Sequence, residues 1–204
     1  MIDSNDINTI IGPAGTSKTF ITCYYALKAL RDNTHHKIIL TKPIQEAGEK
    51  LGSLPGSVEE KIDPFYNSFF TNFEKIAGKA TMNRLLKKGI IETRPLAYMR
   101  GATFDNAICI LDEAQNANIK QIMLFITRMG KDTKVIVSGD IRQYDINKNN
   151  VALPFFIEHV INDITGIGNF EFCDDDIMRN SILIEITKRY ELLKNSEKIP
   201  KNLL

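Results

Sequence analysis

Residues 12–19 read GPAGTSKT, and this stretch with its two flanks decides the fold. A short β-branched run, Ile7–Ile11, precedes it, and a helical pattern over Lys18–Arg31 follows it. Glycine-rich loops between a strand and a helix are the usual cradles of phosphate groups. The stretch departs from the pattern G-x-x-x-x-G-K-[ST] at one position only, because Ser17 stands where the pattern has glycine.

The chemistry of such a loop follows from its residue types. Gly12 and Gly15 can adopt backbone angles that other residues avoid, so that successive N–H groups converge on phosphate oxygens at the start of the helix. Lys18 would reach the β- and γ-phosphates, and the Thr19 hydroxyl would ligate Mg²⁺. A plain strand-to-helix turn is the alternative, and Ser17 is disfavoured only if its position needs a positive φ. The candidate phosphate-binding residues are Gly12, Pro13, Ala14, Gly15, Thr16, Ser17, Lys18, Thr19 and Phe20.

Short apolar runs alternate with helical patterns along the whole chain. The predicted strands are Ile7–Ile11, Lys37–Thr41, Ile90–Thr93, Ala107–Leu111, Lys134–Ser138 and Phe170–Cys173. The predicted helices are Lys18–Arg31, Val58–Ala77 with an interruption at Pro64, Thr81–Lys88, Ile119–Met129 and Met178–Lys194. This alternation predicts one α/β domain over residues 1–204, with a mostly parallel sheet and helices on both faces. In such sheets, ligands bind at the carboxyl ends of the strands.

Composition excludes several classes of protein. The chain has 204 residues, a net charge of +1 and 25% charged residues, so nothing draws the molecule as a whole to nucleic acid or membrane. Its three cysteines are scattered without a C-x-x-C pair, which argues against a disulfide framework or a zinc site and favours a reducing, cytoplasmic setting. The first ten residues do not resemble a signal peptide, and no apolar run reaches the ~18–20 residues of a membrane helix.

Two later strand ends carry polar side chains. Asp112 and Glu113 follow the run AICIL, where Asp112 could hold Mg²⁺ through water and Glu113 could orient or deprotonate an attacking water. The alternative for this acidic pair is a purely structural role, in which it caps the next helix. The next apolar strand ends in SGDIRQ, where Asp140 closes the strand and Gln143 could reach a γ-phosphate. An ordinary β-turn would also explain that segment.

Several segments together resemble the PhoH-like proteins, a branch of the P-loop ATPases related to superfamily 1 helicases. The segments are GPAGTSKTF, TKPIQEAGEKLGSLPGSVEEKIDPF, RPLAYMRGATFDNA, ILDEAQNANIKQIMLFITRMG, KVIVSGDIRQYD and DDDIMRNSILIEI. The resemblance implies a RecA-like domain that binds ATP with Mg²⁺. Carried over by position, it implies that Lys18 and Thr19 hold phosphate and metal, that Asp112 and Glu113 are the metal-linked and catalytic acids, and that Gln143 senses the γ-phosphate.

The resemblance also concerns two arginines and the start of the chain. Arg128 and Arg179 look like family arginines that reach nucleotide, in one subunit or across an interface, although a cation near a helix end needs no such role. Relatives usually carry a helix with a glutamine before the first strand. About six residues precede Ile7 here, so the resemblance does not carry over a preference for ATP above GTP.

Three functions remain open from the sequence. The first is an ATPase, and the second is a nucleotide-binding switch or assembly protein with little hydrolysis. The third is a motor on RNA or single-stranded DNA, which would need a homo-oligomeric ring, hexameric for example, because a single RecA-like domain lacks the second half of a helicase clamp. The stretch Arg94–Arg100, RPLAYMR, could bind single strands through Tyr98 and its arginines, or simply pack on the sheet edge.

Overall fold

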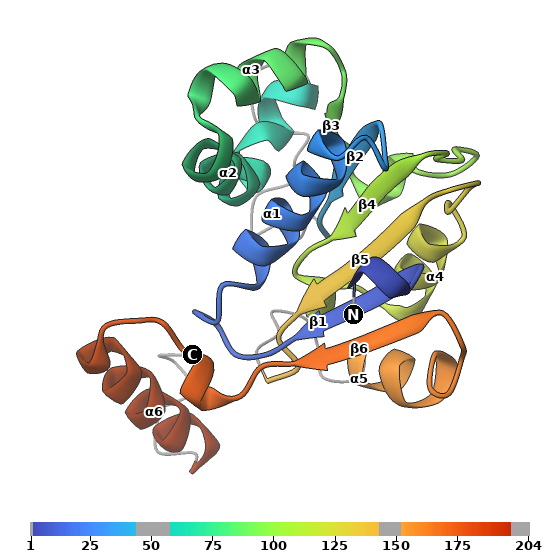
Figure 1. Ribbon diagram of the computed structural model, residues 1–204. Helices are drawn as coiled ribbons and strands as arrows, with labels where there is room; N and C mark the ends of the chain where they lie inside the picture. Colours follow the sequence, from blue (N-terminus) through green and yellow to red (C-terminus); the bar gives the residue numbers. More distant parts are fainter. Residues whose placement is uncertain (1, 44–57, 143–151, 197–204) are drawn as a thin grey trace.

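Six parallel strands form one twisted sheet at the centre of the protein (Figure 1). The computed structural model describes residues 2–43, 58–142 and 152–196. The strands lie in the order β3-β2-β4-β5-β1-β6, and every pairing between neighbours is parallel. Their bounds are β1 Ile7–Ile11, β2 Lys37–Thr41, β3 Ile91–Thr93, β4 Ala107–Leu111, β5 Lys134–Gly139 and β6 Ile167–Glu171. The predicted α/β class is therefore confirmed.

The two fully buried strands lie in the middle of this sheet. Every residue of β4 and β5 is buried, because helices cover both faces and leave no side of these strands in water. Their neighbour β1 is buried along four of its five residues. The strands β4, β5 and β1, after which the predicted site residues lie, are neighbours in the sheet. Their carboxyl ends therefore lie side by side at one edge.

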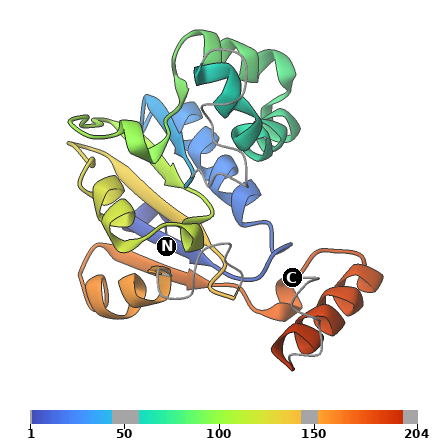
Figure 2. The same ribbon diagram turned by 180° about the vertical axis from the view of Figure 1, so that it is seen from behind.

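Helices cover the two faces as two layers (Figures 1 and 2). On one face lie α1 (Lys18–Arg31), α2 (Val58–Ala77) and α3 (Lys79–Lys87). Phe69, Phe73 and Met82 of this layer pack in one apolar core with Ile38 and Ile110 of the sheet. On the other face lie α4 (Ile119–Ile126), the single turn α5 (Leu153–Phe155) and the π-helical turn η6 (Phe156–Val160). These elements enclose a second apolar core around Phe125 and Phe156.

Some predicted boundaries were wrong. Pro64 does not interrupt α2, which is continuous and buries Tyr66, Phe69 and Phe73. The helix predicted over Ile119–Met129 ends at Ile126, where the Thr127 hydroxyl bonds to the Met123 and Leu124 carbonyls. The last strand is Ile167–Glu171 in place of Phe170–Cys173, because it pairs with β1 along its whole length. The last helix, α6, spans Ser181–Asn195 and not Met178–Lys194, and α5 with η6 was not predicted.

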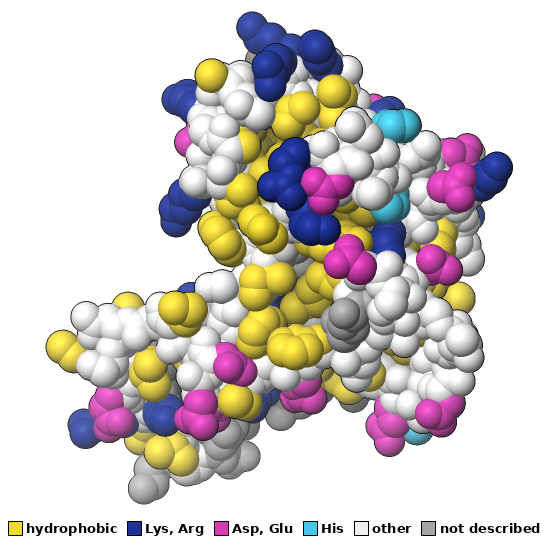
Figure 3. All heavy atoms as spheres, in the orientation of Figure 1, with side chains coloured by type: hydrophobic (Ala, Val, Ile, Leu, Met, Phe, Trp, Pro, Cys, Tyr) yellow, Lys and Arg dark blue, Asp and Glu magenta, His cyan; other side chains and the backbone are white. Residues whose placement is uncertain are grey.

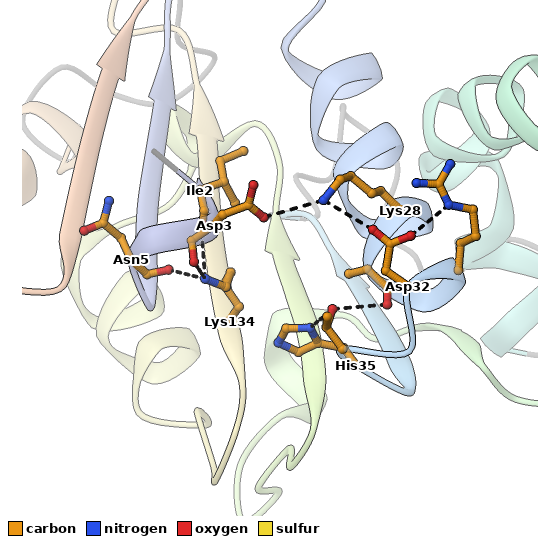
Figure 4. Close-up of polar contacts among 10 residues, drawn as sticks. Ile2, Asp3, Asn5, Lys28, Asp32, His35 and Lys134 are labelled. Atoms are coloured by element: carbon orange, nitrogen blue, oxygen red, sulfur yellow. Dashed lines mark hydrogen bonds and ion pairs between the residues drawn. The ribbon is translucent and has the colours of Figure 1, made fainter.

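The first residues are fastened at the end of the sheet away from the loop (Figure 4). Lys134 begins β5 and is buried, and its ammonium donates to the carbonyls of Ile2 at 2.7 Å, Asp3 at 3.2 Å and Asn5 at 2.6 Å. Asp3 also lies 3.8 Å from Lys28, near the end of α1. The short 3₁₀ turn η1 (Ile2–Ser4) is thus tied to the amino ends of the strands.

The last helix lies apart from the two layers. In both views α6 stands off the sheet, joined to β6 by the 3₁₀ turn η7 (Asp174–Asp176) and a short connection (Figures 1 and 2). Most of its described side chains are exposed. Neither α6 nor any other helix in the described part of the chain has the length and apolar character needed to cross a membrane.

Candidate nucleotide site

A polar pocket of about 490 Å³ opens at the carboxyl ends of β1, β4 and β5. This is the edge at which parallel α/β sheets bind ligands. The residues that line it are Ala14, Gly15, Ser17, Lys18, Thr19, Phe20, Asn72, Lys75, Asp112, Glu113, Gln115, Asp140, Met178 and Arg179. The structure therefore brings the loop and the acidic strand ends together in one place.

The loop between β1 and α1 is closed by its own polar groups. The buried Thr16 hydroxyl donates to the Pro13 carbonyl at 2.9 Å. The Lys18 ammonium donates to the carbonyls of Gly12 at 2.7 Å and Pro13 at 2.9 Å, so it lies over the loop. Ser17 has φ 63° and ψ 24°, the left-handed conformation that favours glycine. The position does need a positive φ, and serine occupies it at a conformational cost.

That cost leads to a first prediction. Ser17→Gly should stabilise the fold by about 1 kcal/mol, since a left-handed L-residue costs about 1–2 kcal/mol and the greater freedom of glycine in the unfolded chain offsets part of the gain. Urea denaturation of the two proteins measures the difference. Because the backbone already adopts the required shape, ATP turnover should change less than about tenfold, or about 1.4 kcal/mol of barrier. A loss of stability on Ser17→Gly would contradict the argument from φ.

A buried carboxylate faces the start of α1. Asp112, only 2% exposed, accepts a hydrogen bond from the Thr19 hydroxyl at 3.1 Å. Its same oxygen lies 3.3 Å from the ammonium of Lys42, which follows β2 and is itself mostly buried. Sequence analysis did not single out Lys42. It directly follows β2, which pairs with β4, and residues at the carboxyl ends of neighbouring parallel strands lie close together, so this position could have indicated it.

The oxygen atoms at this end of the pocket fit Mg²⁺. This cation is usually held by one or two carboxylates together with substrate phosphates, and seldom by an all-protein cage. Thr19 and Asp112 supply a hydroxyl and a carboxylate side by side. Asp140 is 4% exposed, and its Oδ2 has no hydrogen-bond partner among the residues that the structure describes. Within those same residues there is no group of three or more His, Cys, Asp or Glu side chains that could hold a metal ion.

Glu113 is held by a glutamine that sequence analysis did not single out. Gln115 is 4% exposed, and its amide nitrogen donates to the Glu113 carboxylate at 2.6 Å. Its amide oxygen accepts from the backbone N–H of Asp140 at 3.0 Å. Glu113 itself adopts a left-handed conformation with φ 55°. One buried side chain thus links the acid after β4 to the turn after β5.

This link predicts a double effect of Gln115→Leu. Leucine has a similar size but leaves the Asp140 N–H buried without an acceptor, which should lower the free energy of unfolding by about 1–3 kcal/mol. It also frees the Glu113 carboxylate, and we expect ATP turnover to fall about tenfold. Gln115→Glu separates the two effects, because it keeps an acceptor for the Asp140 N–H but sets a second carboxyl group against Glu113 in place of the amide donor. Wild-type stability and turnover in the leucine variant would exclude a positioning role for Gln115.

The charges of the pocket act on its lysine. Burial lowers the pKa of the Lys18 ammonium below its usual value, and the nearby guanidinium of Arg179 lowers it further. Three carboxylates oppose this shift and favour the charged form: Asp140, Glu113 and Asp112. A phosphate chain entering the pocket would add negative charge and stabilise the cation in the same way.

The remaining predicted residues fall in three different places. Arg179 lies on the loop of its own chain, where its side chain would be 2.7 Å from a Cβ atom added to Gly15, and the Met178 N–H donates to the Gly15 carbonyl at 3.1 Å. Arg128 is not brought to this pocket: it ends the α4 region and donates to the Ala102 carbonyl at 3.1 Å, before β4 begins. Gln143 lies outside the described residues.

Comparisons with known proteins agree with one another. The family model described as "PhoH-like protein" matches residues 1–191. A PhoH-like protein of Bacillus subtilis (strain 168) is 41% identical over 187 residues, covering 92% of this chain and 59% of that protein. Protein PhoH of Escherichia coli (strain K12) is 41% identical over 188 residues, covering 89% of this chain and 52% of that protein. The chain thus spans little more than half the length of these relatives.

A solved structure shares the fold. The large terminase of the thermophilic bacteriophage D6E superimposes with a TM-score of 0.57 over 93% of this chain and 45% of its own, at 10% sequence identity. At that level of identity the likeness concerns the arrangement of strands and helices alone. This comparison therefore supports the α/β fold with its parallel sheet.

Proposed function

This chain belongs to the PhoH-like protein family, and from that premise we propose that it binds ATP with Mg²⁺ and hydrolyses the γ-phosphate bond. The observation that supports this most is the single pocket that gathers Lys18, Thr19, Asp112 and Glu113 at the carboxyl edge of the sheet. Hydrolysis of a phosphate chain uses a cation, a hydroxyl and a carboxylate for the metal, and a base for the water. Lys18, Thr19, Asp112 and Glu113 supply these four groups in that order.

The proposed mechanism rests on positioning. The N–H groups of the loop and the Lys18 ammonium hold the β- and γ-phosphates. Mg²⁺, when bound near Thr19 and Asp112, supplies charge neutralisation of the phosphate oxygens. Glu113 orients a water molecule and takes its proton as the water oxygen bonds to the γ-phosphorus. The bond between that phosphorus and the bridging oxygen breaks, and ADP leaves with the electron pair.

Arg179 has a place in this scheme within one subunit. Its guanidinium neighbours the loop at Gly15, so it can stabilise charge on the transferring phosphoryl group in its own chain. Arg128 lies away from the pocket of its own chain, so a contact with nucleotide would have to be made to that of a neighbouring subunit.

A second candidate function is a nucleotide-binding switch or assembly protein with negligible hydrolysis. The observation that favours it is the 2.6 Å hydrogen bond from Gln115 to one oxygen of the Glu113 carboxylate, which leaves only the other oxygen to act on water. This candidate predicts tight ATP binding and nucleotide-dependent oligomerisation without turnover. Steady-state ATP hydrolysis together with equilibrium binding of ATP and GTP separates the two.

Action on RNA or single-stranded DNA is a further part of the proposal. Leu96 and Met99 of the RPLAYMR stretch are buried and serve packing, whereas Tyr98 is 63% exposed and Arg100 is exposed as well. An exposed aromatic ring beside a cation suits base stacking and phosphate contact. Steady-state ATPase assays with and without single-stranded RNA and DNA test it. Stimulation that Tyr98→Ala reduces would support the contact, and equal rates with and without either strand would count against it.

A further inference from the structure

A lysine ammonium lies beside the carboxylate that faces the start of α1. The Nζ atom of Lys42 is 3.3 Å from Oδ2 of Asp112, the same oxygen that accepts from the Thr19 hydroxyl at 3.1 Å. The side chains of Lys42 and Asp112 are only 12% and 3% exposed, so water and salt screen this pair of charges weakly. Asp112 is the carboxylate that the proposed function assigns to Mg²⁺. A cation of the protein itself therefore already neutralises that carboxylate.

Lys42 also has partners on α2. Its ammonium donates to the Ser68 hydroxyl at 2.7 Å and lies 5.2 Å from the centre of the Phe69 ring. An aromatic face attracts an ammonium at this distance. If another cation engages the Asp112 carboxylate, Lys42 thus keeps a hydroxyl and an aromatic ring as partners. The ammonium can release the carboxylate without losing all of its contacts.

The pocket beside this pair is open to solvent. In Figure 3 the surface is hollowed between the upper helices and the arm formed by α6, and in Figure 1 the strand arrows point toward this hollow. A small cation can therefore reach the carboxyl ends of the strands without a change of shape. Charge, and not access, then decides whether a free metal ion binds there.

The balance of charge at the pocket opposes a metal ion that arrives alone. The described residues that line the pocket include three basic and three acidic side chains: Lys18, Lys75, Arg179, Asp112, Glu113 and Asp140. With Lys42 beside Asp112, the basic groups number four against three. A phosphate chain reverses this balance, because it brings several negative charges into the same space. The loss of Lys42 would remove the basic group that lies against the metal carboxylate.

We propose that Lys42 is a positioning residue that substitutes for the metal ion at Asp112. While the pocket holds no nucleotide, its ammonium keeps the carboxylate beside Thr19 and disfavours the binding of free Mg²⁺. When a phosphate chain brings its negative charge, Lys42 yields the carboxylate and keeps its contacts with Ser68 and Phe69. The inference rests on the metal site of the proposed function, and it adds an order of binding to that site.

A purely structural ion pair is the alternative, because a buried carboxylate needs a partner whatever its function. The two roles differ in what happens when Lys42 is neutralised. A structural pair predicts a less stable protein whose stability does not respond to Mg²⁺. The proposed role predicts a protein that has gained a Mg²⁺ site without nucleotide, so that Mg²⁺ restores part of the lost stability.

Thermal unfolding of the full chain without nucleotide, over a range of Mg²⁺ concentrations at constant ionic strength, tests the inference. Lys42→Met should bind Mg²⁺ at least about tenfold more tightly than the wild type, so that its Tm rises at concentrations that leave the wild type unchanged. Lys42→Gln keeps a donor for the carboxylate but no charge, and it should gain in the same way. Lys42→Arg keeps the charge and should respond as the wild type does. Circular dichroism verifies folding, and Lys42→Gln decides the test if Lys42→Met does not fold.

Two further variants locate the effect. Lys37→Met removes the lysine at the other end of β2, which pairs with Glu92, and should create no Mg²⁺ site. Adding Asp112→Asn to the neutral Lys42 variant should abolish the gain.

The inference would be overturned if Mg²⁺ stabilised the wild type as much as the neutral Lys42 variants, or stabilised neither of them. An equal gain in Lys37→Met, in Lys42→Arg or in the variant that also carries Asp112→Asn would overturn it as well. None of these measurements involves hydrolysis, so a protein without ATP turnover would refute the proposed ATPase and leave this test intact.

Discussion

Lys18→Ala should lower ATP turnover by roughly 10²–10³-fold, the usual effect of removing one group that stabilises charge on a reacting centre. The ammonium lies over the loop, held by two loop carbonyls, and three carboxylates around the pocket oppose the lowering of its pKa by burial. Alanine removes the cation without touching the backbone N–H groups, so the loop keeps part of its affinity for phosphate. A coupled steady-state assay measures turnover, and fluorescence titration with a labelled ATP analogue measures binding.

Lys131→Ala is the matched control for this variant. Lys131 lies in the turn before β5, its side chain is 86% exposed, and it does not line the pocket. Its loss should leave turnover within twofold or so of the wild type. Equal turnover in wild type, Lys131→Ala and Lys18→Ala would remove the phosphate loop from the proposed function, and any hydrolysis would then have to be assigned to another site or to a contaminant.

Glu113→Gln should lower turnover by roughly 10²–10⁴-fold while ATP binding is retained, because a general base contributes about that factor. The change keeps the shape of the side chain, and an amide can still pair with Gln115. The loss would therefore report the missing carboxylate and not a local collapse. Single-turnover measurements with excess protein distinguish slow chemistry from slow product release.

Glu158→Gln makes the same chemical change on the far layer of helices. Glu158 lies in η6 with a side chain that is 74% exposed, away from the pocket, so turnover should be unaffected. If Glu113→Gln hydrolyses ATP at the wild-type rate, Glu113 is not the base. If both the wild type and this variant bind ATP tightly and neither turns it over, the switch function replaces the ATPase.

The sequence predicted the sheet because its signals were local. β4 is an apolar run of five residues, and β5 has the apolar run Val135–Val137 at its centre, as expected of strands in the middle of a parallel sheet. The loop, Asp112 and Glu113 were found because they follow those runs directly. Helix ends were less predictable: α4 stops three residues early, and the N–H groups of Arg128 and Met129 bond to carbonyls three residues back in place of four.

Other parts of the site depend on contacts between distant segments. Gln115 is a short-range neighbour of Glu113, but its importance comes from the Asp140 N–H at the end of another strand. Lys42 acquires its role from the pairing of β2 with β4. The backbone of Ser17 could not be assigned to the left-handed region from its identity, because serine rarely occupies it. Periodicity carries no information about any of these contacts.

The anchoring of α6 on the phosphate loop has a thermodynamic consequence. Met178 and Arg179 touch Gly15, so the base of α6 and the entering phosphates share one loop. If nucleotide binding changes the free energy with which α6 is held at the loop, displacing α6 must change the affinity for that nucleotide by the same factor. The position of α6 and the occupancy of the phosphate pocket are then coupled in both directions.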